Sequence, residues 1–285
     1  MSKVYFTREI SPENVLKLFK ALDIELGGRV AVKLHSGETG NQNFLKPDFF
    51  APVINAVNGT VVECNTAYEG TRNTTDAHRK TMEEHGWSKY FNVDIMDADG
   101  EISLPISGGK HLMENFVGKT FNDYDSMLVL SHFKGHPMGG FGGALKNISI
   151  GLASSHGKAH IHGVGEPDKI WTADHDSFLE CMAEAAKSIM DVMNGRIAFV
   201  NVMKNMSVDC DCCAVAADPK IGDIGILSSL DPVALDKACV DLVYASQDAG
   251  KTDLIERMES RNGIHTVDAA AELGVGSKEY ELIEI

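Results

Sequence analysis

Residues Ser126–Leu130 read SMLVL, and Ser131–His162 continue as SHFKGHPMGGFGGALKNISIGLASSHGKAHIH. The first segment is a short apolar run, which predicts a buried strand. The 32 residues after it hold five of the eleven histidines and three lysines, with no Asp or Glu among them. Because the chain has a formal net charge of −15, this acid-free segment after a buried strand marks the expected site.

Strand and helix patterns alternate on both sides of this segment. Strands are predicted at residues 3–7, 29–34, 60–63, 92–96, 196–203, 223–228 and 280–285. A helix is predicted to begin at Ser11–Asn14, and further helices are predicted at 48–57, 75–85, 176–194 and 233–245, with capping signals at Ser11, Thr75 and Asp231. This alternation predicts an α/β fold with a mainly parallel sheet flanked by helices.

We expect residues 1–285 to form a single domain, and the alternative is two lobes that share a cleft, with a break near residues 105–125. In open α/β sheets, ligands bind at the carboxyl ends of the strands. The loops after Leu34, Glu63, Leu130 and Met203 should therefore lie together. The predicted cleft is lined by His35, Asn65, His78, His136, Lys146 and the 210–213 loop.

The composition indicates which kinds of partner the protein binds and where in the cell it is found. The acidic balance argues against nucleic acid or an anionic membrane as the main partner, so a small-molecule ligand is expected. No apolar run approaches the length of a membrane span, and the first residues lack a signal-peptide pattern. The six cysteines are irregularly spaced, which favours a reduced, cytoplasmic protein. A redox partner or a homo-oligomer remains open.

Three groups of residues in the sequence could bind a ligand or perform chemistry. His160-x-His162 would put two imidazoles on one side of an extended chain, where a metal could use them with a third ligand, although Lys158 beside them would repel a cation. A single loop histidine is more often only hydrogen-bonded. The loop before Lys146 contains Gly139, Gly140, Gly142 and Gly143. These glycines form either a cradle for an anion or a tight structural turn, and they match neither the Walker motif nor the dinucleotide-binding motif.

Cys210-Asp211-Cys212-Cys213 is the third group. Cys210 and Cys213 are the one pair with C-x-x-C spacing, and no repeated cysteine pattern accompanies them, so a conventional ferredoxin cluster is not supported. One or two thiolates, with Cys210 and Cys212 as the candidates, could ligate a metal or perform redox chemistry. The alternative is that these thiols are buried and inert.

Four segments resemble domain-of-unknown-function family 362, whose members are often labelled uncharacterised iron–sulfur centre proteins. They are KLHSGETGNQNFLKP, SHFKGHPMGGFGGALKNISIGLAS, DCDCC and DIGILSSLDPVALDKACVDLV. Many relatives carry two ferredoxin-type cysteine repeats just after the histidine-rich segment. This chain has GVGEPDKIWTADHDSF there, which contains no cysteine.

The segment from His136 to Lys146 also has a more distant resemblance, to the signature of nickel-pincer lactate racemases. That resemblance implies that Lys146 tethers a pincer cofactor next to the glycines and His35, and that His162 binds nickel or another transition metal. It further implies that His78 and His136 exchange protons, because His78-Arg79 resembles a His-Arg pair of the racemases. Gly142 replaces the usual serine, and the racemases' substrate loop is absent.

Three functions follow as hypotheses. The leading one is a metal- or cofactor-dependent enzyme that acts on a small hydroxy acid or a related metabolite. It would transfer protons and hydride as racemases or epimerases do, and it would be an isomerase or an oxidoreductase. The second is a non-catalytic or redox metal-binding protein in which Cys210, Cys212 and Cys213 join histidines around iron, zinc or nickel. The third is an anion- or nucleotide-binding module that uses the glycine loop.

Overall fold

The computed structural model describes residues 1–285, which are organised around an eight-stranded sheet. In spatial order its strands are β12 (Tyr280–Glu284), β1 (Ser2–Thr7), β11 (Gly225–Ser229), β10 (Ile197–Met203), β7 (Ser126–His132), β2 (Val30–Lys33), β3 (Thr60–Glu63) and β4 (Val93–Ile95). Five neighbouring pairs are parallel, and only β11 runs against both of its neighbours, β1 and β10. The prediction of a mainly parallel α/β sheet is confirmed.

The central strands β7 and β10 are buried along their whole length. Successive side chains of a strand point to opposite faces of its sheet. Met127 and Val129 accordingly pack into the larger apolar cluster on one face, whereas Leu128 and Leu130 pack into the cluster on the other face. A continuous apolar run such as residues 127–130 is what a strand covered on both faces requires.

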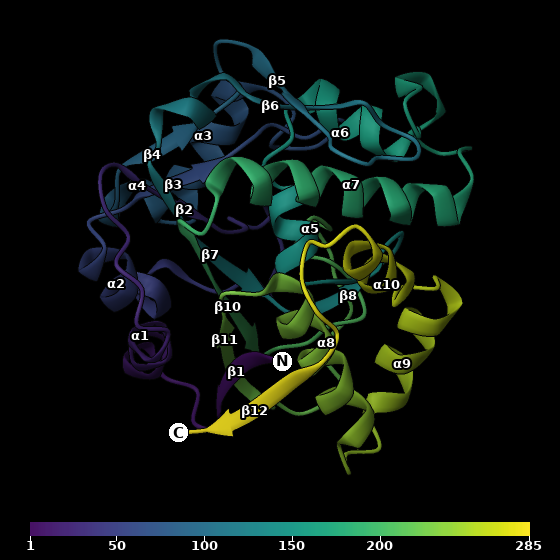
Figure 1. The fold of residues 1–285 in the computed structure, drawn as a ribbon. Coiled ribbons are helices and arrows are strands. Elements are labelled where there is room, and N and C mark those ends of the chain that lie inside the picture. The colour runs from purple at the N-terminus through teal and green to yellow at the C-terminus, as the bar shows by residue number, and fades with distance from the viewer.

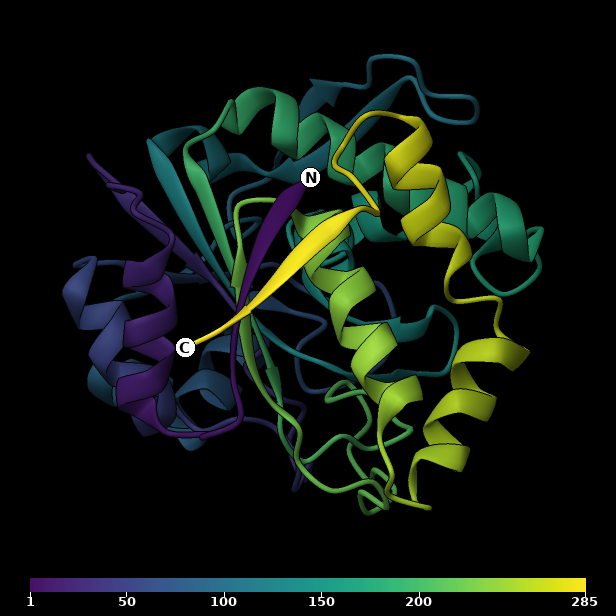
Figure 2. The same ribbon diagram turned by 60° about the horizontal axis from the view of Figure 1, so that its bottom comes forward.

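Helices cover both faces of the sheet, and Figure 2 shows α1 and α8 on opposite sides of the strands. The smaller cluster contains residues of α1 (Pro12–Ala21), α2 (Pro47–Ala56), α3 (Thr75–Glu84) and α4 (Trp87–Tyr90). The larger cluster contains residues of α5 (Ala144–Ser149), α7 (His175–Met193), α8 (Pro232–Ala245), α9 (Lys251–Ser260) and α10 (His265–Glu272). The long helix α7 packs against α5, α6 and α10 (Figure 1).

Local signals explain where several helices begin. The side chain of Ser11 accepts a hydrogen bond from Asn14 N at 3.2 Å, and Asp231 accepts from Val233 N at 2.9 Å. Two short hairpins were not expected from the sequence, β5 (Glu101–Pro105) with β6 (Glu114–Gly118) and β8 (Lys134–His136) with β9 (Gly140–Gly142). The remaining short elements are η1 (Lys119–Asp123) and η2 (Pro167–Lys169).

The extended chain expected at residues 160–162 is wrong, because these residues end helix α6 (Ser155–His162). The side chain of Ser154 caps this helix by accepting from Gly157 N at 2.9 Å. Residues two apart on a helix do not face each other. His160 lies against Phe116, whereas His162 stacks on Phe178 with ring centroids 4.7 Å apart. The two imidazoles therefore do not form a pair.

The glycine run before α5 is part of a packed turn. The Asp236 carboxylate accepts from Ala144 N at 2.7 Å and from Leu145 N at 2.9 Å, and it also accepts from Asn201 Nδ2 at 2.7 Å. A Cβ at Gly143 would lie 2.3 Å from this carboxylate. The first amides of α5 are thus already bound from within the protein, and the structural-turn interpretation of the glycines is favoured over the anion cradle.

Replacing Asp236 with alanine should lower the free energy of unfolding by about 2–4 kcal/mol, because three buried donors lose their acceptor. The matched control is Asp191→Ala on the exposed face of α7, where an ion pair with Lys187 is worth at most about 0.5 kcal/mol. Urea unfolding of both variants measures the difference. Equal losses in the two variants would contradict this account of the α5 cap.

Candidate functional site

A pocket of about 300 Å³ lies where the loops after β2, β3, β7 and β10 meet α5 and α6. Of the residues singled out in the sequence, the pocket is lined by His35, Gly142, Gly143, His136, Lys146, His162, Cys210, Cys212 and Cys213. Asn65, His78, Gly139 and Gly140 do not line it. The expected gathering of loops at the strand ends is therefore observed, together with most of the predicted site residues.

The wall of the pocket is rich in cationic side chains, namely Lys33, Arg72, Lys134, Lys146 and Lys158. Arg72 pairs with Glu38 at 3.0 Å and with Glu63 at 3.4 Å, and Lys134 pairs with Asp211 at 2.9 Å. Lys33, Lys146 and Lys158 have no carboxylate within 4.0 Å of the amine. In an acidic protein, this excess of positive charge favours an anionic ligand.

Lys33 and Lys158 lie at the buried end of the pocket, with exposed fractions of 1% and 7%. The Lys158 amine donates to the carbonyl oxygens of Cys64 at 3.4 Å and Ala153 at 2.5 Å, and the Lys33 amine donates to the carbonyl of Leu34. Burial lowers the pKa of Lys33 to about 8 and also lowers the pKa of Lys158. Each ammonium group retains donors that these carbonyls do not use.

His78 lies behind the pocket, on α3, with its side chain fully buried. Its Nδ1 is 3.3 Å from Asn65 Oδ1, and its Nε2 faces Glu63 Oε2 at 3.7 Å without a hydrogen-bond partner. Burial lowers the pKa of His78 to about 3. Glu63 itself lines the pocket, so His78 can act on a ligand only through Glu63, and a direct proton exchange between His78 and His136 is not supported by this geometry.

The tautomer of His136 follows from its backbone contacts. Its Nδ1 accepts hydrogen bonds from Gly139 N at 2.9 Å and Met138 N at 3.2 Å, so this nitrogen must be unprotonated. Burial lowers the pKa of His136 to about 4, which keeps the ring neutral at pH 7 with its proton on Nε2. His136 therefore offers a hydrogen-bond donor to the pocket, and the base part of its predicted proton exchange is disfavoured.

His162 has the opposite tautomer. Its Nδ1 is 2.7 Å from the carbonyl oxygen of Lys158, which has only lone pairs, so Nδ1 carries the proton and donates it. Burial lowers the pKa of His162 to about 4. The Nε2 atom consequently presents a free lone pair. An imidazole whose second nitrogen donates to a carbonyl is the usual arrangement of a metal-binding histidine.

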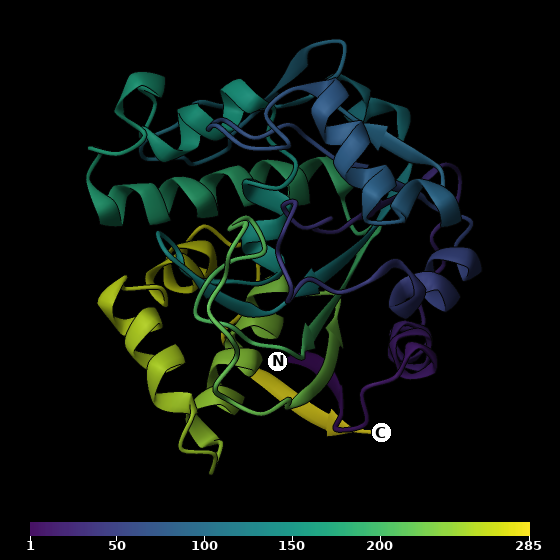
Figure 3. The same cartoon turned by 180° about the vertical axis from the view of Figure 1, so that it is seen from behind.

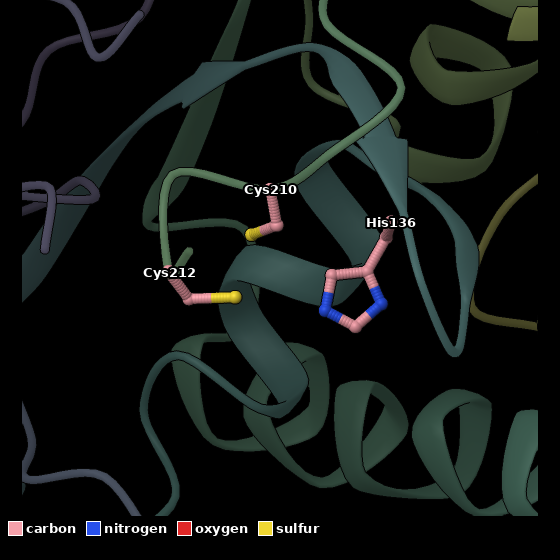
Figure 4. Close-up of side chains that lie close together, drawn as sticks. All are labelled: His136, Cys210 and Cys212. Carbon is pink, nitrogen blue, oxygen red and sulfur yellow. The ribbon is translucent and has the colours of Figure 1, made fainter. Parts of the chain in front are cut away.

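The thiols of the 210–213 loop meet His136 at the pocket wall. Figure 4 shows the His136 ring and the sulfur atoms of Cys210 and Cys212 directed toward one another. Their potential ligand atoms all lie within 4.8 Å of each other. His162 is not a member of this group, so the predicted ligand set of His162 with Cys210 and Cys212 is not brought together. All six cysteines are free thiols.

The loop after β2 holds the cysteine loop in place, and the two loops lie side by side in Figure 3. Side chains of Asn41, Gln42 and Asn43 donate to the carbonyls of Cys213, Ala216 and Ala217, at 2.8, 2.6 and 2.9 Å respectively. The polar sequence GNQN thus serves to fix the neighbouring loop rather than to bind a ligand. His35, at the start of this loop, also lies against the Cys210 side chain.

Sequence reasoning missed several lining residues, among them Lys33, Glu63, Arg72, Lys134 and Trp171. Lys33 and Glu63 are the last residues of their strands, and a charged residue at the end of an otherwise apolar strand was the available signal. Lys134 belonged to the acid-free segment. Trp171 had no local signal, because its place at the pocket depends on how η2 packs against α6.

The fold and pocket define an α/β protein with a ligand-sized cavity at the carboxyl ends of its strands. The chain belongs to the family described as domain of unknown function (DUF362), whose sequence model matches residues 30–241. No curated protein matches the chain. No helix of the protein combines the length and apolar character needed to cross a membrane.

Eight solved chains match this structure. One is a structural-genomics target from Thermotoga maritima, with 11% identity, a TM-score of 0.47 and coverage of 92% of this chain. The match covers 59% of that protein, so the present chain spans less than two thirds of its length. Another is the lactate racemase apoprotein from Thermoanaerobacterium thermosaccharolyticum, with 10% identity, a TM-score of 0.45 and coverage of 99% of this chain and 82% of that chain.

Nitrogen NMR of histidine-labelled protein should find His35 and His136 protonated at Nε2 and His162 protonated at Nδ1. His35 should have the same tautomer as His136, because the Nδ1 atom of His35 accepts a hydrogen bond from Gly37 N at 3.1 Å. All three rings should stay neutral from pH 7 down to about pH 5, because burial lowers each pKa to about 4. A single tautomer for all three rings would contradict this assignment.

The lowered pKa values of these histidines also determine how the free energy of unfolding changes with pH. In the window between the ordinary histidine pKa of about 6.5 and the lowered value near 4, only the unfolded chain takes up protons. The free energy of unfolding is therefore unaffected by these rings above that window, and it decreases as the pH falls through the window.

Proposed function

We propose that the pocket binds a small hydroxy acid or a related carboxylate and supports proton and hydride chemistry at the hydroxyl-bearing carbon. The observation that carries this proposal is the pair of opposite tautomers around Lys146: His136 offers an N–H and His162 offers a lone pair. Lys146 is near both rings, since its charge contributes to lowering the pKa of each. A donor, an acceptor and an amine thus surround one cavity.

The residues fit a metal-bearing cofactor tethered to lysine. The Lys146 amine has no carboxylate partner and lines the pocket, and the His162 Nε2 lone pair is free in the same pocket. Lys146 would therefore hold the cofactor covalently, and His162 would hold its metal. When bound, such a group supplies acceptance and return of hydride, which side chains alone cannot provide.

The remaining chemistry belongs to the chain itself. The ammonium groups of Lys33 and Lys158 orient the substrate carboxylate at the buried end of the pocket. His136 donates its Nε2 hydrogen to an oxygen of the substrate and stabilises negative charge that develops there. Glu63 contacts Arg72 and Ser36 N and keeps this end of the pocket polar. Burial alone would raise the pKa of its carboxyl, but Lys33, His35 and Arg72 have the larger effect and hold that pKa far below the ordinary range. Glu63 therefore contributes no proton.

Protein purified from its native host should carry a mass adduct on Lys146 and a stoichiometric transition metal. Lys146→Arg keeps a positive charge but lacks the primary amine that a covalent tether to lysine uses, so the adduct should disappear. His162→Ala should lose the metal, whereas Cys210→Ser should retain it. Intact mass and elemental analysis measure these outcomes. The absence of both adduct and metal from the wild-type protein would remove the tethered cofactor.

A second function is favoured by one observation, the proximity of His136 to Cys210 and Cys212. Two thiolates are suitable ligands for zinc, iron or nickel. His136 would serve such a centre as a hydrogen-bond donor to sulfur, because its Nδ1 already accepts two amide N–H groups. If the metal is lost in Cys210→Ser and kept in His162→Ala, this thiolate centre replaces the leading proposal.

Carboxylate recognition can be tested without any cofactor. Lys158→Met removes one ammonium group from the buried end and should weaken the binding of lactate by about tenfold or more, the value of a hydrogen bond to a charged group. The matched control is Lys187→Met on α7, which removes a lysine paired with Asp191 away from the pocket. Calorimetric titration compares the two. Equal affinity in Lys158→Met and wild type would contradict this role.

A further inference from the structure

The outer part of the pocket differs chemically from its buried end. Met138, Ile170 and Trp171 line it and come from two separate segments, the β8–β9 turn and the residues after η2. The buried Ile150, at the end of α5, adds apolar surface to the same pocket. Trp171 is 72% exposed, whereas the other tryptophan of the chain, Trp87, is fully buried. An exposed indole at the opening of a pocket is unusual, because large aromatic side chains normally bury most of their surface.

Exposure orders the lining residues by depth. Lys33 and Lys158 are 1% and 7% exposed, and Trp171 is 72% exposed. The two most buried amines therefore lie deep in the pocket, and Trp171 lies at its opening with the half-buried Met138 and Ile170. Ile150 is as buried as Lys158. Met138 and Ile150 pack on the apolar cluster shared by α6 and α7, which gives this side of the opening a rigid base. A ligand that enters with its anionic end first leaves its other end against this apolar surface.

We infer that the substrate is an amphiphilic carboxylate, with an acid group at one end and an apolar substituent that packs beneath Trp171 at the other. This inference rests on the proposed function, because it takes the carboxylate site at Lys33 and Lys158 as given. The cavity of about 300 Å³ has room for more than a three-carbon acid. Trp171 determines specificity by covering the substituent, and it takes no part in proton transfer.

The experiment is a chain-length series with glycolate, lactate, 2-hydroxyhexanoate and 3-phenyllactate, with 2-hydroxyhexanamide as the uncharged analogue. Calorimetry gives the dissociation constants, and tryptophan fluorescence reports the position of Trp171 against the constant background of Trp87. We expect about fourfold tighter binding for each methylene that is buried. We also expect a blue shift of the emission with 2-hydroxyhexanoate and none with glycolate, since only the longer acid reaches the indole.

Two variants separate covering by the indole from general effects on the fold. Trp171→Ala should weaken 2-hydroxyhexanoate by about tenfold and glycolate by less than about twofold. Trp171→Phe retains an aromatic cover and should keep most of the chain-length dependence. Because Trp171 is mostly exposed, neither substitution should prevent folding, and circular dichroism of both variants verifies this.

The outcomes distinguish this inference from the proposed function. Acids that bind with no dependence on chain length, or a dependence that is unchanged in Trp171→Ala, would overturn the inference and leave carboxylate binding intact. An amide that binds as tightly as its acid would overturn carboxylate recognition itself. Binding of none of the acids would overturn both.

Discussion

The buried carboxylate of Asp211 connects the segments that build the pocket. It pairs with the Lys134 amine at 2.9 Å and with His132 Nδ1 at 3.0 Å, while its backbone carbonyl accepts from Glu38 N at 2.8 Å. Glu38 in turn binds Arg72, which binds Glu63 at the end of β3. Ion pairs and one backbone hydrogen bond thus join β8, the cysteine loop and the loops after β2 and β3. Removing one member would leave a buried charge without its partner, which is strongly destabilising.

The histidines of the site also have defined tautomers, and the cause is local to each ring. Each ring is held by a backbone group of its own segment: amide N–H groups for His35 and His136, and a carbonyl for His162. A rigid backbone therefore decides which nitrogen carries the proton before any ligand arrives. Preorganised donors and acceptors of this kind need no rearrangement during a reaction, which is the main source of electrostatic catalysis.

Much of the fold could be predicted, because its strands are apolar runs and its helices begin at capping residues such as Ser11 and Asp231. The joint position of His136 and Lys146 was expected from the loop that follows a buried strand, and that of His162 from the resemblance to the racemase signature. The helical state of residues 155–162 did not, because it depends on the Ser154 cap and on the packing of Ile161 and Phe178 in one apolar cluster. His78 was misplaced because its depth is set by contacts with Asn65 and Glu63, which sequence spacing does not contain. The family model and the pocket geometry leave the reaction itself as a proposal.

Two lysines buried without carboxylate partners have a thermodynamic meaning beyond recognition. Burial lowers the pKa of both lysines, and the charge of Lys158 lowers that of Lys33 further, so the folded protein holds like charges in a poorly hydrated place. Substitutions that remove one of these charges would then raise stability while weakening function, the trade-off expected where a site is built for a ligand. The buried end of the pocket is in this sense an electrostatically unfavourable part of the molecule. An anion bound between these amines would offset their repulsion, so occupancy of the site and stability of the fold are linked.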